Sequence, residues 1–192
     1  MKARDFVVTA AVAMAIGWAG RSVFPDDAPK TPPAGEDWAK FGQPGDEHAR
    51  LKPLVGVWNV VGEFVGPDGS VVKSESTSSM SMILGDRYLQ QEVHGSVLGT
   101  AFEGRSLIGF DNGSKKWFNV WVDSMGTGLL VADGVEDEKG RRWTFNGSFN
   151  GPSGPIQSRD VVTITGENEF TWVSYMGGVE KPTMSMKASR RK

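Results

Sequence analysis

The sequence predicts an all-β domain: an antiparallel up-and-down β-barrel of about eight to ten strands, lipocalin- or calycin-like, with one short N-terminal helix. Apolar and polar residues alternate along many short segments. Turn-forming residues separate these segments, as in Gly66-Pro67-Asp68-Gly69. No long helical pattern interrupts the series, and closure into a barrel would remove the exposed strand edges.

Composition supports one globular domain with appendages. Of the 192 residues, 39% are hydrophobic and 23% charged, with 25 glycines. The net charge of −2 provides no electrostatic basis for binding nucleic acid. The chain has no cysteine, which excludes disulfides, thiolate catalysis and cysteine-ligated zinc.

The N-terminus predicts export. Lys2 and Arg4 precede an uncharged run from Phe6 to Ala19. As a helix this run would span about 21 Å, less than the ~30 Å of a membrane core. Gly17 and Ala19 have the small side chains that signal peptidase requires. Residues 1–19 are therefore a signal peptide cleaved after Ala19 or an uncleaved membrane anchor, and both alternatives predict a periplasmic or secreted domain.

A proline-rich linker follows over residues 20–45, which contain five of the chain's ten prolines. Such a composition favours a semi-extended tether. Trp38 and Phe41 are among its large apolar residues, and we expect them to dock weakly on the domain. The barrel domain is predicted over residues 46–192.

The first element of the domain is a short helix. Asp46 is a suitable N-cap, the helix continues to Leu51, and Pro53 ends it. Alternation and turn residues then predict strands near 57–65, 71–82, 88–97, 101–110, 117–123, 129–136, 143–150, 156–165, 170–176 and 183–190.

The segment from Phe102 to Gly128 is the most informative part of the chain. On its second strand Trp117, Asn119, Trp121 and Asp123 occupy one face, while valines and a phenylalanine occupy the other. An ordinary half-buried hairpin keeps its polar residues on the solvent face. Here the polar residues share their face with two tryptophans and the opposite face is apolar, which indicates a barrel with a lined interior.

Several motifs in the chain resemble a bacterial family of unknown function, DUF1579. The matching pieces are EHARLKPLVGVW, LGDRYLQQEVHG, FEGRSLIGFDNGSKKWFNVWVDSMGTG and a closing strand that ends in Arg190. They span about three quarters of the chain, although Ala188 replaces an expected aromatic residue. The resemblance implies a lipocalin-type barrel, in which Gly56-x-Trp58 starts the first strand, and it implies no established activity.

The candidate ligand-binding residues are polar or aromatic side chains on three consecutive predicted strands, 88–97, 101–110 and 117–123, and on two later ones, 156–165 and 170–176. In a barrel, some of them could converge on a polar spot within an apolar lumen and orient a ligand. The alternative is that the charged members, and Asp160 beside Arg159, form ion pairs on the exterior. The candidates are Glu92, His94, Glu103, Arg105, Trp121, Asp123, Arg159 and Tyr175.

Catalytic and cofactor chemistry find less support. Paired carboxylates can perform acid–base catalysis, but no nucleophile–base motif accompanies these. His94 shares a strand face with Glu92 and could ligate haem from the lumen, although no second ligand is visible. Two distant histidines with scattered carboxylates do not form a recognisable metal set. We therefore expect no cofactor, no metal and no catalytic residue.

The function predicted is the binding of a small, mostly apolar or amphipathic molecule in the lumen of an exported barrel. One alternative is an enzyme that acts on a small envelope metabolite through Glu92, Glu103 or Asp123. Another is a filled barrel that binds other proteins through its loops. An empty apolar lumen distinguishes the first function from the last.

Overall fold

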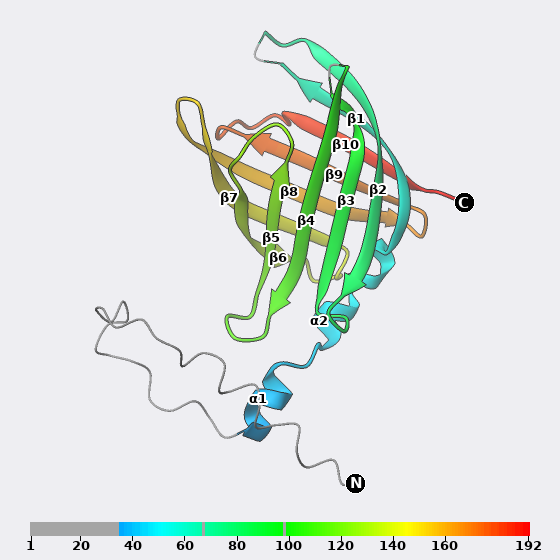
Figure 1. Cartoon of the computed structure of the whole chain (residues 1–192), viewed down its shortest axis with the longest axis vertical. Coiled ribbons are helices and arrows are strands. Elements are labelled where there is room, and N and C mark those ends of the chain that lie inside the picture. Colours follow the sequence, from blue (N-terminus) through cyan, green and yellow to red (C-terminus); the bar gives the residue numbers. More distant parts are fainter. Residues whose placement is uncertain (1–34, 67, 98) are drawn as a thin grey trace, which may run out of the picture. The chain divides into compact units, whose positions relative to one another are not determined.

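The computed structural model describes residues 35–66, 68–97 and 99–192. The predicted signal peptide or anchor, and the linker as far as residue 34, lie outside these ranges. Most of the described chain is β-structure, as the sequence predicts (Figure 1).

The described strands form one closed antiparallel barrel. Each strand pairs with the next along the chain, and the last pairs with the first. The strands are β1 (Gly56–Val65), β2 (Val71–Ile83), β3 (Tyr88–Val97), β4 (Thr100–Asp111), β5 (Lys116–Asp123), β6 (Leu130–Glu136), β7 (Arg142–Gly151), β8 (Gly154–Gly166), β9 (Glu169–Met176) and β10 (Met184–Arg190). The predicted meander and its closure are confirmed.

In the part of the chain that the structure describes, two α-helices and one 3-10 turn precede β1. They are α1 (Gly35–Phe41), α2 (Asp46–Ala49) and the turn η1 (Lys52–Leu54). Asp46 was predicted to cap the short helix, but Gly45 is its N-cap and Asp46 its first residue. Helix α1 was not predicted. It forms in a proline-free stretch, GEDWAKF, within the segment assigned to the linker.

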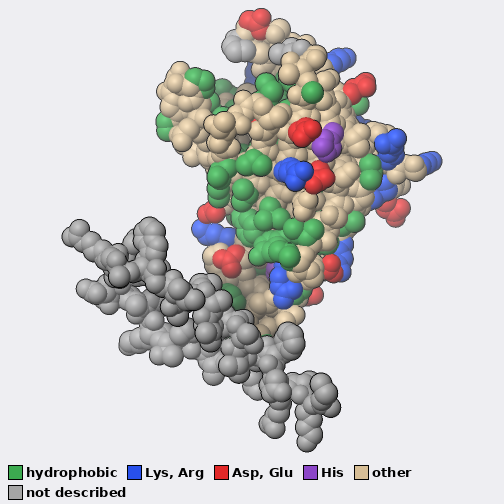
Figure 2. Space-filling model, in the orientation of Figure 1, with side chains coloured by type: hydrophobic (Ala, Val, Ile, Leu, Met, Phe, Trp, Pro, Cys, Tyr) green, Lys and Arg blue, Asp and Glu red, His purple; other side chains and the backbone are tan. Residues whose placement is uncertain are grey.

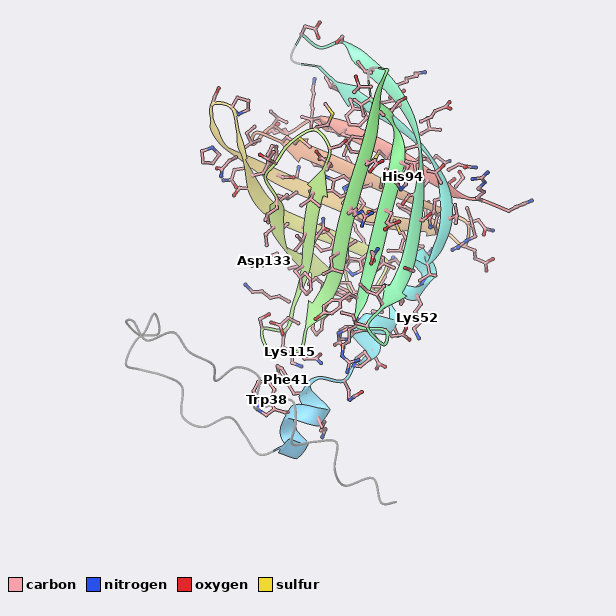
Figure 3. The ribbon with its side chains drawn as sticks, viewed as in Figure 1. Trp38, Phe41, Lys52, His94, Lys115 and Asp133 are labelled. Carbon is pink, nitrogen blue, oxygen red and sulfur yellow. The ribbon has the colours of Figure 1, made fainter. Side chains whose placement is uncertain are left out.

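Helix α1 has a small contact with the barrel. The Nδ2 group of Asn112 donates hydrogen bonds to the carbonyl oxygens of Phe41 and Gln43, at 2.8 and 2.9 Å. Trp38 and Phe41 pack edge to face with their ring centroids 5.5 Å apart (Figure 3). Both side chains stay about half exposed, which agrees with the weak docking predicted.

Trp58 closes the end of the barrel next to α2 and η1. Its indole nitrogen donates to the carbonyl oxygen of Leu54 at 2.8 Å. Its ring packs edge-on against Phe170, with centroids 4.8 Å apart. The guanidinium of Arg190 lies 4.1 Å from the centre of the same ring. Trp58 is 1% exposed, so its apolar surface is almost fully buried.

The seam between β1 and β10 explains the G-x-W motif. Arg190 donates from Nη1 to the Val55 carbonyl at 2.6 Å and from Nη2 to the Pro53 carbonyl at 2.8 Å. A Cβ on Gly56 would lie 2.4 Å from Nη1 of Arg190, and the backbone of Gly56 has a φ of +138°. Only glycine therefore leaves room for the arginine that covers Trp58.

Further aromatic side chains fill this half of the barrel. Trp117 packs against Phe110 and Trp143, with centroid distances of 5.4 and 5.6 Å. Trp143 and Phe145 are each 1% exposed. The packed aromatic layer means that any internal space must lie toward the opposite end.

The outer face of β3–β6 carries apolar side chains, which gather on the side of the barrel seen in Figure 2. Tyr88 and Phe118 fold over Gly109, and their ring centroids lie 6.1 Å apart. Next to them, Val120 is paired with Val131, which is 51% exposed. Because this outer face is apolar, β5 carries apolar residues on both its outer and its inner side.

Candidate functional site

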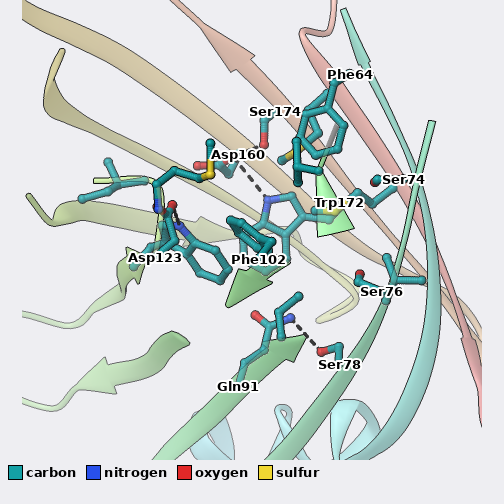
Figure 4. A pocket seen from close by; sticks show the side chains of 18 of the residues that line it. Phe64, Ser74, Ser76, Ser78, Gln91, Phe102, Asp123, Asp160, Trp172 and Ser174 are labelled. Carbon is teal, nitrogen blue, oxygen red and sulfur yellow. Dashed lines mark hydrogen bonds between the residues drawn. The ribbon is translucent and has the colours of Figure 1, made fainter. Parts of the chain in front are cut away.

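A cavity of about 230 Å³ occupies the half of the lumen that the aromatic core leaves open. Strand β2 contributes small side chains to its wall, namely Ser74, Ser76 and Ser78 (Figure 4). These serines stand where larger residues would fill the barrel, so the cavity follows directly from the sequence of β2.

Apolar side chains form much of the cavity wall and surround its outer part. Phe64 and Met176 stand at the ends of β1 and β9 that lie away from helix α2. Met184 begins β10, and Met125 follows β5, at this same end. Methionine side chains adapt to differently shaped neighbours, so this region can accommodate an apolar molecule.

A buried carboxylate lies within the cavity wall. Asp160 on β8 is 4% exposed and accepts a hydrogen bond from Oγ of Ser158 at 2.9 Å. Oγ of Ser174 and the indole nitrogen of Trp172, the latter at 3.3 Å, donate to its other oxygen (Figure 4). The sequence prediction missed this residue and treated it as half of an exterior ion pair with Arg159.

A second carboxylate stands nearer the open end. Oδ2 of Asp123 accepts a hydrogen bond from the indole nitrogen of Trp121 at 2.7 Å, and Oδ1 accepts one from the amide of Met125 at 2.9 Å. The Trp121 ring stacks on Phe102 at 6.4 Å and lies over Gly104, where a Cβ would come within 2.4 Å of it. Both Trp121 and Asp123 line the cavity, and their role in binding a ligand stays a prediction.

Two further polar pairs lie inside the barrel. Nε2 of Gln91 donates to Oγ of Ser78 at 2.9 Å, and Oγ of Ser106 donates to Oδ1 of Asn119 at 2.6 Å. All four side chains are buried. The carbonyl oxygen of the Gln91 amide is buried with no hydrogen-bond partner. It is a free acceptor in the wall of the cavity.

Four of the predicted site residues lie on the outer face of the barrel, so their predicted place in the lumen is wrong. Glu92 faces Arg105, with 3.6 Å between carboxylate and guanidinium, and His94 faces Glu103 at 3.9 Å. Their neighbours Gln91 and Val93 line the cavity instead. Successive strand residues point to opposite faces of a sheet. Strand β3 has polar residues on both faces, so the sequence did not reveal which face turns into the lumen.

Arg159 and Tyr175 also lie outside the cavity. They are cross-strand partners on β8 and β9, and the guanidinium of Arg159 sits 3.9 Å above the Tyr175 ring. Arg159 is therefore on the exterior, but it packs on Tyr175 and does not form the ion pair with Asp160 that the exterior alternative described, because Asp160 faces the lumen. Of the eight predicted residues, Trp121 and Asp123 are the two in the cavity wall.

Comparison with known proteins establishes the family. The model of the family described as "Protein of unknown function (DUF1579)" matches residues 43–190. The chain belongs to this family. A search of curated proteins gave no significant match.

Two solved structures share the barrel of this DUF1579 protein. Rv2717c from M. tuberculosis superposes with a TM-score of 0.55 at 12% identity, over 78% of this chain and 100% of that one. The S-type phycobiliprotein lyase CPES from Guillardia theta gives 0.51 at 11% identity, over 78% and 99% of the two chains. At such identities the likeness concerns the fold, which is the calycin-like barrel that the sequence predicted.

The two histidines of the DUF1579 protein do not line the cavity. His94 is exposed on the outer face of β3 (Figure 3), so it cannot ligate haem from within the lumen as considered above. His48 is buried, and its Nδ1 accepts a hydrogen bond from the amide of Gly45 at 3.0 Å. Its ring packs edge-on against Phe110, so His48 stabilises the N-terminus of α2.

Within the described ranges, the DUF1579 protein has neither a cluster of metal ligands nor a helix suited to span a membrane. No group of three or more histidine, aspartate or glutamate side chains there is arranged to hold a metal ion. None of the helices in these ranges has the length and apolar character needed to cross a membrane.

Shifted carboxylate pKa values occur in the turns and on the surface of the DUF1579 barrel. The pKa of Asp111 is lowered, first by a hydrogen bond from the hydroxyl of Ser114 and then by those from the amides of Gly113 and Ser114. The amide of Gly113 lies 2.8 Å from Oδ1 of Asp111. These contacts hold the β4–β5 turn and stand apart from the cavity.

Proposed function

We propose that this barrel binds a small, mostly apolar molecule in its lumen. The observation that supports the proposal is the cavity itself, with about 230 Å³ of space and a largely apolar wall beside a fully packed core. Ligand sites are typically concave and apolar with a few polar groups that fix orientation. Asp160, Asp123 and Gln91 are such groups here.

The lumen contrasts with a filled barrel. The serines of β2 leave space that an apolar side chain would occupy at little cost, and buried polar groups such as Asp160 are costly to keep in an interior. A barrel selected for stability alone would replace both. The likeness to a phycobiliprotein lyase gives analogous support at the level of the fold.

The test is a titration with N-phenylnaphthylamine, a neutral apolar probe whose fluorescence rises in dry surroundings. We expect saturable binding to the full chain, and a Ser76→Phe substitution should weaken it about tenfold or more because the new ring fills the cavity. Ser79→Phe on the outer face of the same strand is the matched control and should bind normally. Binding that Ser76→Phe leaves unchanged would place the probe outside the lumen and refute the proposal. Native mass spectrometry of the purified protein would identify a natural ligand.

We also propose that the domain is exported. The basic start, the short apolar run and the small residues before position 20 support this. Fusion of residues 1–45 to alkaline phosphatase, which is active only outside the bacterial cytoplasm, tests it. An inactive, stably expressed fusion would contradict export.

A further inference from the structure

The charges in the cavity wall are all of one sign. Asp160 and Asp123 contribute carboxylates, and among the described lining residues there is no lysine, arginine or histidine. No salt bridge joins either aspartate to a basic side chain in the described ranges. The lumen therefore combines an apolar wall with an acidic character that the protein itself does not neutralise.

Asp160 has hydrogen-bond donors but no counter-charge. Trp172 can only donate through its indole nitrogen, and Ser158 and Ser174 direct their hydroxyls toward the same carboxylate. A buried carboxylate without an opposite charge is unfavourable, even when it is hydrogen-bonded. A cationic group in the adjacent cavity would supply the charge that is missing.

A second, independent observation comes from the other side of the lumen. Gln91 is 6% exposed and lines the cavity from β3, where its amide oxygen has no partner. A buried acceptor without a hydrogen-bond partner is unfavourable, because it has lost its contacts with water. A ligand with hydrogen-bond donors would satisfy it, whereas a ligand that carries only acceptors would not.

The aromatic wall fits the same chemistry. Trp121, Phe102 and Trp172 line the cavity near the two carboxylates. The faces of aromatic rings attract cations, with tryptophan the strongest. An ammonium group that enters the lumen would thus meet carboxylates within an aromatic wall, while a carboxylate would meet two like charges.

We propose that the lumen selects an apolar amine: a molecule with a protonated ammonium group, placed at Asp160, and a small hydrocarbon body in the apolar part of the cavity. This inference rests on the proposed function and specifies the ligand's class. It separates the protein from barrels that carry fatty acids, since a fatty acid would bring its negative charge into an acidic cavity.

The experiment compares three molecules of equal chain length, octylamine, octanol and octanoate, as competitors of N-phenylnaphthylamine on the full chain near neutral pH. A charge-assisted hydrogen bond to Asp160 should make octylamine bind about tenfold or more tightly than octanol. Octanoate should bind more weakly than octanol.

Variants then test whether Asp160 and Asp123 cause the preference for octylamine over octanol. Asp160→Asn retains the acceptor oxygen and removes the charge, so the preference for octylamine over octanol should fall to about threefold or less. Asp123→Asn should reduce the preference too, and it serves as the test if melting curves show that Asp160→Asn does not fold. Glu103→Gln removes the same charge from the outer face and is the matched control that should keep the full preference.

The outcomes distinguish this inference from the proposed function. If octanol and the fluorescent probe bind but octylamine has no advantage, or octanoate binds as well, the amine proposal is wrong and lumen binding stands. If none of the molecules binds, both are wrong. A preference for octylamine that persists in both folded aspartate variants, or is equally reduced by Glu103→Gln, would also overturn the proposal.

Discussion

Replacing Trp58 with alanine should lower the free energy of unfolding by about 4–5 kcal/mol. Trp58 is 1% exposed, and a buried indole removes ~200 Å² from water, which corresponds to ~5 kcal/mol at ~25 cal/mol per Å². Alanine retains part of that surface. Core tryptophan-to-alanine changes cost ~3–5 kcal/mol, and the lost bond to the Leu54 carbonyl adds ~1 kcal/mol.

The assay is urea denaturation followed by far-ultraviolet circular dichroism. Trp38→Ala is the matched control, since that indole is 51% exposed and its removal should cost under ~0.5 kcal/mol. Trp58→Phe retains a ring but loses the hydrogen bond of the indole nitrogen to Leu54, so an intermediate loss of ~1–2 kcal/mol is expected.

The reasoning would be refuted if Trp58→Ala lost under ~1 kcal/mol, or no more than Trp38→Ala does. Either result would mean that Trp58 does not close the core. A loss of equal size in Trp58→Phe and Trp58→Ala would show that the hydrogen bond, rather than burial, carries the stability.

Three further predictions concern other parts of the chain. Gly104→Ala should cost ~1–3 kcal/mol in urea denaturation and weaken probe binding, because its Cβ would displace the Trp121 ring; unchanged stability would contradict the packing described. The lowered pKa of Asp111 means that its contribution to stability is present above its unfolded pKa of ~3.9 and lost as pH falls through the lower folded value. The wild type should therefore lose more stability than Asp111→Asn between about pH 6 and pH 3, and equal losses would refute this. Limited proteolysis should leave a stable core that begins between about residues 46 and 51, and protection of residues 25–44 would contradict that boundary.

The strands were predictable because their signals are local. Alternation and turn residues placed a strand at 101–110, where the structure has Thr100–Asp111, and one at 71–82, where it has Val71–Ile83. Helix α1 was missed although Lys40 in its last turn and Gly42 directly after it are helix stop signals, because its seven residues lie within a segment assigned as a whole to the proline-rich linker. Pairing of each strand with its neighbour then made closure the natural arrangement.

The site was less predictable because it depends on which face of each strand turns inward. On β5 the two tryptophans identify the face that turns inward, and Trp121 and Asp123 do line the cavity as the sequence predicted. On β3 the run Gln-Gln-Glu-Val-His has polar groups on both faces, so the outward orientation of Glu92 was not evident. Asp160 was missed because its partners Trp172 and Ser174 approach through the register of β8 and β9, which no local pattern records.

The seam between β1 and β10 makes closure of the barrel depend on a contact between its first and last strands. Arg190 must reach Trp58, which precedes it by well over a hundred residues. Before β10 is in place, both β1 and β9 have an unpaired edge that can pair with other chains. Truncation or misfolding of this one strand would therefore expose two strand edges at once and convert a closed barrel into a sheet prone to aggregation.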